Sequence, residues 1–220
     1  MTPAESLKKL ADGNERFVSG LRSIEPMMSH LRLEELAKNG QKPHAIILTC
    51  SDSRSPAEML FDAGIGELFV VRVAGNVVAP SLLASIEFAA ANFGCSLIVV
   101  LGHTLCGAIK ATVEHSLNPS VKLPSSHLEE LIGRIKPAVS KCSANHTGPQ
   151  LITAATHENI RQSCDQIIEQ SKIIRSLVQD GEIAVVGGLL DISNGQVEFQ
   201  LDHRIRELES SGVTGVSTRA

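Results

Sequence analysis

The sequence predicts an α/β protein with a mostly parallel central sheet of four strands, an antiparallel edge strand and helices on both faces. Short apolar runs rich in β-branched residues alternate with longer segments of helical periodicity, which is typical of β–α–β units joined by right-handed crossovers. The chain has 220 residues, 43% of them hydrophobic, which is enough to bury one sizeable core. We therefore expect a single domain over residues 1–220.

An N-terminal helical arm is expected over residues 1–40. In residues 5–19, apolar side chains recur at roughly helical spacing, which is typical of an amphipathic helix that docks on its own subunit or on another. These apolar positions are Leu7, Leu10, Phe17 and Val18. The same stretch is charged throughout and lacks the apolar segment of a secretory signal, so the expected location is the cytoplasm.

The α/β core is expected over residues 41–205. Four apolar runs of strand length indicate strands that are buried on both faces. These runs are residues 44–49, 68–73, 97–101 and 183–189. Asn194 and Gly195 then predict a tight turn, and the alternating residues after it predict the antiparallel edge strand.

Helical periodicity fills the intervals between these strands. The predicted helices are residues 81–92, 108–116, 126–140 and 151–179, the last as a broken or paired helix. Residues 117–126 and 142–150 are rich in Pro, Ser, Asn and Gly, which favours exposed connections.

Charge and composition exclude several classes of partner. The net charge is −4 and no basic cluster occurs, so nucleic acid is not an expected partner. No apolar run approaches the roughly 20 residues that a membrane span requires, so no membrane association is expected. Five cysteines, an odd number without an export signal, argue against a disulfide framework.

Three potential metal ligands follow two of the predicted strands. Cys50 comes directly after the first strand, and His103 and Cys106 follow the third. Ligands of open α/β sheets bind at the carboxyl ends of the strands, so these segments can converge. Two thiolates and one imidazole suit tetrahedral Zn²⁺, and a fourth position remains for water, as in catalytic zinc sites. Gly107 lets the backbone approach the metal.

Any one of these side chains alone is more often an ordinary buried thiol or a turn histidine. Their joint placement favours the metal site. Cys95, Cys142 and Cys164 lack such neighbours in the sequence, which favours a structural role for them.

Asp52 and Arg54 lie two and four residues after Cys50. A carboxylate at this spacing can bind the metal itself or accept a hydrogen bond from a metal-bound hydroxide. A bidentate guanidinium partner would keep the carboxylate ionised and away from the metal. Elsewhere on a surface such a pair would contribute only about 0–1 kcal/mol, but beside Cys50 it indicates a catalytic pair.

At these residues the sequence resembles the β-class carbonic anhydrases. Their signature C-x-D-x-R, followed by H-x-x-C, is matched by Cys50, Asp52, Arg54, His103 and Cys106. Stretches such as FDAGIGELFVVRVAGNVV and VVLGHTLCGAIKA extend the resemblance over residues 41–111, and SLKKLADGNERFV resembles bacterial members.

The resemblance implies one Zn²⁺ per subunit, held by Cys50, His103 and Cys106, and reversible hydration of carbon dioxide to bicarbonate and a proton through zinc-bound hydroxide. Asp52 and Arg54 would form the catalytic dyad, with Asp52 on zinc in a closed, inactive state. The implied assembly is a homodimer, or a dimer of dimers, with active sites near the subunit interface.

The resemblance also implies substrate contacts. Gln41 matches a position whose amide contacts substrate across that interface, with a plain turn residue as the alternative. Phe69 and Phe88 match apolar pocket positions, with plain core residues as the alternative. The backbone N–H of Gly107 is a further candidate donor to the substrate oxygen.

Two departures from the family bear on regulation. Some members hold an inhibitory bicarbonate with Trp, Arg and Tyr; Arg72 matches the arginine, but the chain has no Trp or Tyr, so that inhibitory site should be absent or altered. Ser55 stands where many members have Val, which leaves open how the Asp52 loop switches.

Three other functions compete with carbon dioxide hydration. Carbonyl sulfide or carbon disulfide hydrolysis occurs on the same scaffold, and a zinc-binding or redox-sensing module without enzymatic activity is a different class. A dinucleotide-binding domain is disfavoured, because neither GIGELF nor GNVVAP provides the G-x-G-x-x-G turn.

Overall fold

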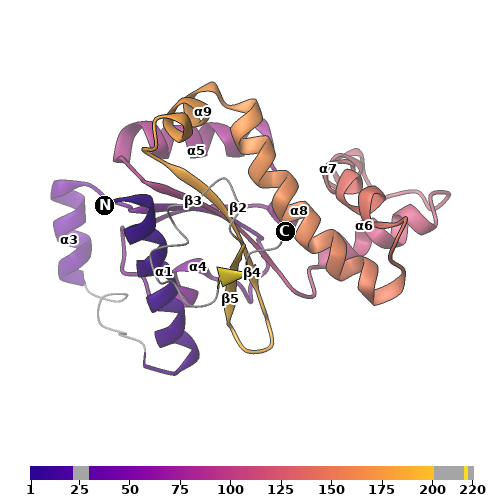
Figure 1. The fold of residues 1–220 in the computed structure, drawn as a ribbon, viewed down its shortest axis with the longest axis horizontal. Coiled ribbons are helices and arrows are strands. Elements are labelled where there is room, and N and C mark those ends of the chain that lie inside the picture. Colours follow the sequence, from indigo (N-terminus) through magenta and orange to yellow (C-terminus); the bar gives the residue numbers. More distant parts are fainter. Residues whose placement is uncertain (22–29, 201–215, 218–220) are drawn as a thin grey trace.

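The computed structural model describes residues 1–21 and 30–200 and the backbone of residues 216–217 (Figure 1). The helices are α1 (Pro3–Val18), α3 (His30–Asn39), α4 (Ala57–Leu60), α5 (Pro80–Phe93), α6 (Gly107–Leu117), α7 (Ser126–Cys142), α8 (Gly148–Gln170) and α9 (Lys172–Gln179). The strands are β1 (Ala45–Thr49), β2 (Leu68–Arg72), β3 (Leu97–His103), β4 (Ala184–Leu190), β5 (Val197–Gln200) and β6 (Val216–Ser217). Strands and helices alternate through most of the chain, as predicted.

The strands form one six-stranded sheet in the order β2-β1-β3-β4-β5-β6. Neighbours among β1 to β4 run parallel, and β5 runs antiparallel to β4. The predicted parallel strands and the antiparallel strand are thereby confirmed. The two-residue β6 pairs with the other side of β5 and is too short to carry a sequence pattern.

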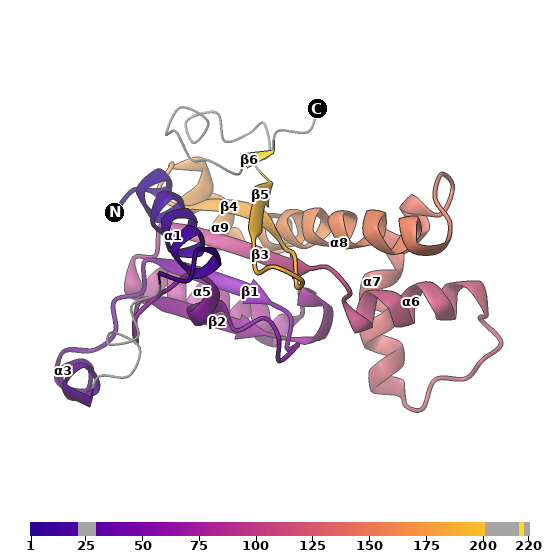
Figure 2. The same ribbon diagram turned by 90° about the horizontal axis from the view of Figure 1, so that it is seen from below.

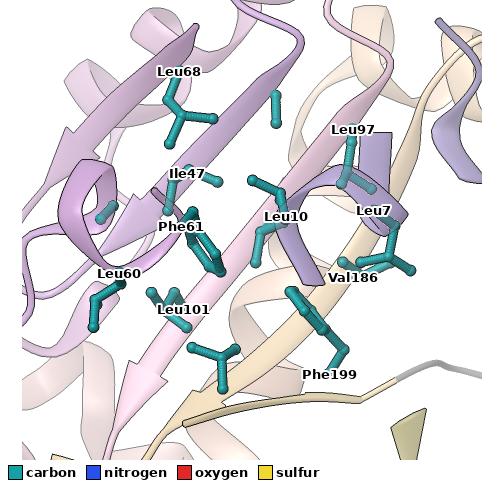
Figure 3. Close-up of a cluster of buried hydrophobic side chains, with 14 of the residues drawn as sticks. Leu7, Leu10, Ile47, Leu60, Phe61, Leu68, Leu97, Leu101, Val186 and Phe199 are labelled. Atoms are coloured by element: carbon teal, nitrogen blue, oxygen red, sulfur yellow. The ribbon is translucent and has the colours of Figure 1, made fainter. Parts of the chain in front are cut away.

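Apolar side chains fill both faces of the parallel strands, because successive residues of a strand point to opposite sides. Ala45 and Ile47 of β1 belong to a core cluster covered by α1 and α4. Ile46 and Leu48 belong to a second cluster covered by α5, α8 and α9. Figure 3 shows the first cluster, with Leu10 of α1 among side chains of the sheet. The prediction of helices on both faces is confirmed.

Beyond the carboxyl ends of the parallel strands lies a third, smaller cluster. It is formed mainly by α6, α7 and the first part of α8, which extend past the sheet (Figure 2). Cys50 and Cys106 belong to this cluster. The candidate metal ligands therefore lie where the sheet meets this group of helices.

Helix α1 of the N-terminal arm docks on its own sheet, whereas α3 has no buried residue. The Asn14 amide of α1 donates to the carbonyls of Leu60 (3.0 Å) and Gly195 (2.9 Å), and its oxygen accepts from the N–H of Val197 (2.8 Å). These bonds join α1 to α4 and to the turn before β5. Of the predicted arm, residues 22–29 lie outside the described residues, as does the predicted end of the core at 205.

The helix predictions held with shifts of a few residues at the ends. The long segment 151–179 is divided at Ser171 into α8 and α9, so its prediction as a broken or paired helix is confirmed. The predicted connection 142–150 is shorter, because α8 begins at Gly148. The short α4 was not predicted, since four residues are too few to show helical periodicity. None of the helices in the described residues is long and apolar enough to cross a membrane.

Shortening an α1 side chain that is buried in the core is expected to destabilise the fold. Leu10 is 1% exposed, so Leu10→Ala leaves a cavity and should lower the free energy of unfolding by about 2–5 kcal/mol. Leu21 is 72% exposed, and Leu21→Ala should change it by less than about 0.5 kcal/mol. Urea denaturation measures both; equal effects would contradict the docking of α1.

Candidate metal centre

Three donor side chains meet at the carboxyl edge of the sheet. Cys50 follows the last residue of β1, His103 ends β3, and Cys106 immediately precedes α6. Because β1 and β3 are adjacent parallel strands, their carboxyl ends lie side by side. The two Sγ atoms and an imidazole nitrogen all lie within 4.8 Å of one another, and all three residues are buried. The predicted convergence of these residues is confirmed.

The imidazole of His103 is held in the tautomer that a metal requires. Its Nδ1 lies 2.8 Å from the carbonyl oxygen of Thr104; since a carbonyl only accepts, the proton is on Nδ1. In the neutral imidazole Nε2 therefore carries the lone pair, and this buried atom has no hydrogen-bond partner among the described residues. A buried nitrogen usually has a hydrogen-bond partner. This nitrogen and the two neighbouring thiols together form a set of ligands that suits a metal ion.

The spacing of the donors also fits a metal. Tetrahedral zinc with two thiolates and one imidazole holds its ligand atoms roughly 3.5–3.8 Å apart. In this structure the three ligand atoms lie within 4.8 Å of one another, which is somewhat wider. A small movement of side chains would therefore complete such a site. The donor chemistry suits a borderline-soft divalent ion.

The two thiols differ in acidity. A hydrogen bond from Cys106 lowers the pKa of Cys50, against the effect of burial, and the N–H of Gly75 also donates to the Cys50 Sγ (3.3 Å). The hydrogen bond to Cys50 and burial raise the pKa of Cys106, which backbone N–H groups at the start of α6 partly oppose. A bound cation would displace the proton of Cys106, because metal ligation requires thiolates.

Asp52 lies beside the donors with both carboxylate oxygens bound by Arg54. The Nε of Arg54 donates to Oδ1 (2.9 Å) and its terminal nitrogen to Oδ2 (2.8 Å). These bonds hold the pKa of Asp52 well below its usual range, so the carboxylate is ionised near neutral pH. Oδ2 lies 4.0 Å from Nε2 of His103. The bidentate pair expected from the sequence is present.

Hydrogen bonds from the end of β2 anchor the loop that carries Asp52. Arg72, the last residue of β2, donates to the carbonyl oxygens of Cys50 (3.1 Å) and Asp52 (2.6 Å). The hydroxyl and N–H of the buried Ser55 also donate to the Asp52 carbonyl (3.0 and 3.1 Å). The sequence singled out Arg72 and Ser55 only through family comparison. Here their side chains anchor the backbone of the site.

Backbone features complete the surroundings of the site. Leu105 is an exposed residue with φ +57°, and its carbonyl oxygen accepts from Arg54 (3.4 Å). Gly107 is the first residue of α6, where N–H groups have no partner within the helix. No described atom lies within 4 Å of the position that a Cβ of Gly107 would occupy. Protein packing alone therefore does not require glycine there.

The three remaining predicted substrate residues lie apart from the donors within one chain. Gln41 is exposed in the segment before β1. Phe69 pairs with Ile46 near the start of β1, at the opposite end of that strand from Cys50. Phe88 of α5 is 54% exposed and, like Phe69, its ring contacts that of Phe93.

Cys95 lies away from the donors, as the sequence predicted. Its thiol donates to the carbonyl oxygen of Pro43 (3.3 Å), and burial raises its pKa to about 11. A protonated, buried thiol of this kind is inert. The Gly75 N–H, in contrast, is part of the centre but was not predicted, because every non-proline residue carries such a donor.

Comparison with known proteins gives consistent matches along the chain. The family model described as carbonic anhydrase matches residues 45–197. Carbonic anhydrase 2 of Mycobacterium tuberculosis is 35% identical over 201 residues, which cover 91% of this chain and 94% of the relative. The carbonic anhydrase of Mycolicibacterium smegmatis is 34% identical over 198 residues, covering 90% and 93% of the two chains.

Solved structures show the same architecture. The β-carbonic anhydrase CcaA superposes with a TM-score of 0.67 at 25% identity, covering 88% of this chain and 94% of the other. A structure from a study of two tetrameric β-carbonic anhydrases of Sordaria macrospora has a TM-score of 0.65 at 24% identity. The match covers 76% of this chain and 84% of the other. The latter likeness shows the fold alone.

Replacing one donor is expected to abolish tight metal binding. The purified chain should carry about one metal ion, and Cys106→Ser should carry far less, because a neutral hydroxyl is a much weaker ligand than a thiolate. Cys142→Ser is the matched control, since Cys142 does not belong to the set of three potential metal ligands. Plasma mass spectrometry measures the content; equal metal in wild type and Cys106→Ser would remove Cys106 from the ligand set.

Proposed function

The chain belongs to the β-carbonic anhydrase family, and on this basis we propose that it hydrates carbon dioxide reversibly to bicarbonate and a proton, with one Zn²⁺ held by Cys50, His103 and Cys106. One observation carries the proposal: a buried set of three donors, one of them an orphaned imidazole nitrogen, lies beside a carboxylate that Arg54 holds ionised. Three protein ligands with an open position are typical of catalytic zinc.

The reaction needs a hydroxide-like nucleophile near neutral pH. When bound, Zn²⁺ supplies the Lewis acidity that lowers the pKa of a water from about 15.7 towards 7. Two thiolates donate more charge than imidazoles do, which leaves that value somewhat higher. Activity is therefore expected to rise towards alkaline pH.

Asp52 orients the nucleophile in this proposal. Its ionised carboxylate has about four lone-pair sites. The guanidinium of Arg54 occupies one on each oxygen, and the backbone N–H of Arg54 occupies a second on Oδ1. The remaining site on Oδ2, which lies 4.0 Å from Nε2 of His103, can accept the proton of a hydroxyl group beside the donors. A fixed acceptor aims the nucleophile at carbon dioxide, which is catalysis by orientation.

Arg54 has two tasks in the same scheme. It keeps Asp52 ionised, and it holds the carboxylate away from the metal position. Without this partner the carboxylate would be free to become a fourth ligand, which is the closed, inactive state in which Asp52 binds zinc. The anchoring of the Asp52 carbonyl by Arg72 and Ser55 favours the open arrangement.

The substrate side of the site is completed by the N–H of Gly107 and by a second copy of the chain. Gln41, Phe69 and Phe88 lie apart from the donors of their own subunit, so their roles in binding substrate require a neighbour's site. A homodimer, or a dimer of dimers, meets this requirement. The exposed Phe88 ring and the helix α3, in which no residue is buried, are surfaces available for that contact.

Stopped-flow carbon dioxide hydration on protein of known zinc content tests the proposal. We expect fast turnover that rises from mildly acidic to alkaline pH and is lost with the metal. Turnover on carbonyl sulfide and carbon disulfide is measured in parallel. Turnover on those substrates alone would replace the proposal with the rival hydrolysis, and zinc-loaded protein inactive on all three would indicate a zinc-binding or redox-sensing module.

Removing the guanidinium partner of Asp52 is expected to impair catalysis. Arg54→Gln should lower turnover by roughly 10- to 100-fold, the usual effect of removing a group that hydrogen-bonds to a residue at a metal site. The zinc content should be retained. Arg161→Gln is a matched control, since the Arg161 side chain is 49% exposed against 48% for Arg54 and also pairs with a carboxylate. Unchanged turnover in Arg54→Gln would refute the dyad.

A further inference from the structure

A tight turn between β2 and α5 contacts the candidate ligand Cys50. The turn includes Gly75 and Asn76, both in the left-handed region with φ of +71° and +43°. The N–H of Gly75 donates to the Cys50 Sγ at 3.3 Å. Hydrogen bonds from backbone N–H groups reduce the charge that a thiolate donates to a metal, so this contact bears on the ligand itself.

Packing at Gly75 leaves no freedom for a side chain. A Cβ there would lie 2.8 Å from Cδ1 of Ile135 and 3.2 Å from the Cβ of Ala108. Glycine adopts positive φ without strain, whereas Asn76 does so at a cost unless its surroundings hold it. The conformation that aims the Gly75 N–H at sulfur therefore needs support from other parts of the chain.

Helix α8 supplies that support through two buried side chains. The amide of Asn159 donates to the Gly75 carbonyl oxygen (2.8 Å), and the hydroxyl of Ser163 donates to the Asn76 carbonyl oxygen (3.1 Å). The two residues are one helical turn apart on the same face. Asn159 is 1% exposed, and its Oδ1 has no hydrogen-bond partner in the described part of the chain. The Gly75 carbonyl is thus the one partner of this buried amide.

We propose that Asn159 is a positioning residue for the metal ligand Cys50, acting through Gly75. Asn159 holds the carbonyl of the peptide that follows Gly75, which restricts φ and ψ of this glycine and so the direction of the N–H in the peptide that precedes it. The Cys50 thiolate then receives a hydrogen bond in a constant geometry, which tunes its charge donation and its affinity for the ion. The inference rests on the proposed metal site.

Cobalt-substituted protein tests this role, because the energy of the thiolate-to-cobalt charge-transfer band reports the charge on sulfur. Asn159→Leu keeps the size of the side chain and removes the donor. Asn159→Ala is the second variant, with room for a solvent molecule in case the leucine is not tolerated. Thr156→Val is the control, since the hydroxyl of the buried Thr156 in the same helix donates to the carbonyl of Ile152, one turn earlier in that helix.

In variants with wild-type circular dichroism, we expect the band to move to lower energy and cobalt affinity, measured by chelator competition, to fall roughly 10- to 100-fold. The control should match wild type in both. Unchanged band energy and affinity in a folded Asn159 variant would overturn the positioning role alone. Wild-type protein that takes up neither cobalt nor zinc would overturn the metal site, and with it the proposed function.

Discussion

The candidate centre depends on the parallel pairing of β1 with β2 on one side and β3 on the other. In this register Thr49 lies between Arg72 and Leu101. The next residue after β1, Cys50, therefore lies between the end of β2, which supplies Arg72, and the end of β3, which supplies His103. A shift of one residue in either pair would turn these side chains towards the wrong face of the sheet. Both faces of β1 are apolar, so close packing of its side chains in the two core clusters, rather than an alternation of polar and apolar residues, fixes this register.

Three side chains around the centre are each oriented by backbone atoms. His103 is oriented by the carbonyl of Thr104, the Cys50 sulfur by the N–H of Gly75, and Arg72 by two carbonyls of the Asp52 loop. Backbone partners cannot rotate away as side chains do, so the donors are held before an ion binds. Preorganisation of this kind lowers the reorganisation that binding and catalysis would otherwise require.

The sheet and the helices beyond its carboxyl edge make different contributions to the centre. The strands deliver the donors to one edge, whereas α6, α7 and α8 enclose Cys50 and Cys106 in a small apolar cluster that limits access of water. The same enclosure makes Nε2 of His103, which has no hydrogen-bond partner in the described part of the chain, costly to bury.

The sequence by itself determined the strands and the donors. Strands buried on both faces must be continuous apolar runs, so β1 to β4 were evident, and thiol and imidazole side chains at strand ends are specific enough to indicate a metal. The pairing of Asp52 with Arg54 was also predicted, because they lie only two positions apart in the chain. Tertiary structure alone decided that Arg72 anchors the Asp52 loop and that Asn159 holds Gly75. These contacts join residues far apart in the chain or depend on backbone N–H and C=O groups. Nearly every residue carries such groups, and only the packed φ and ψ angles decide where they point.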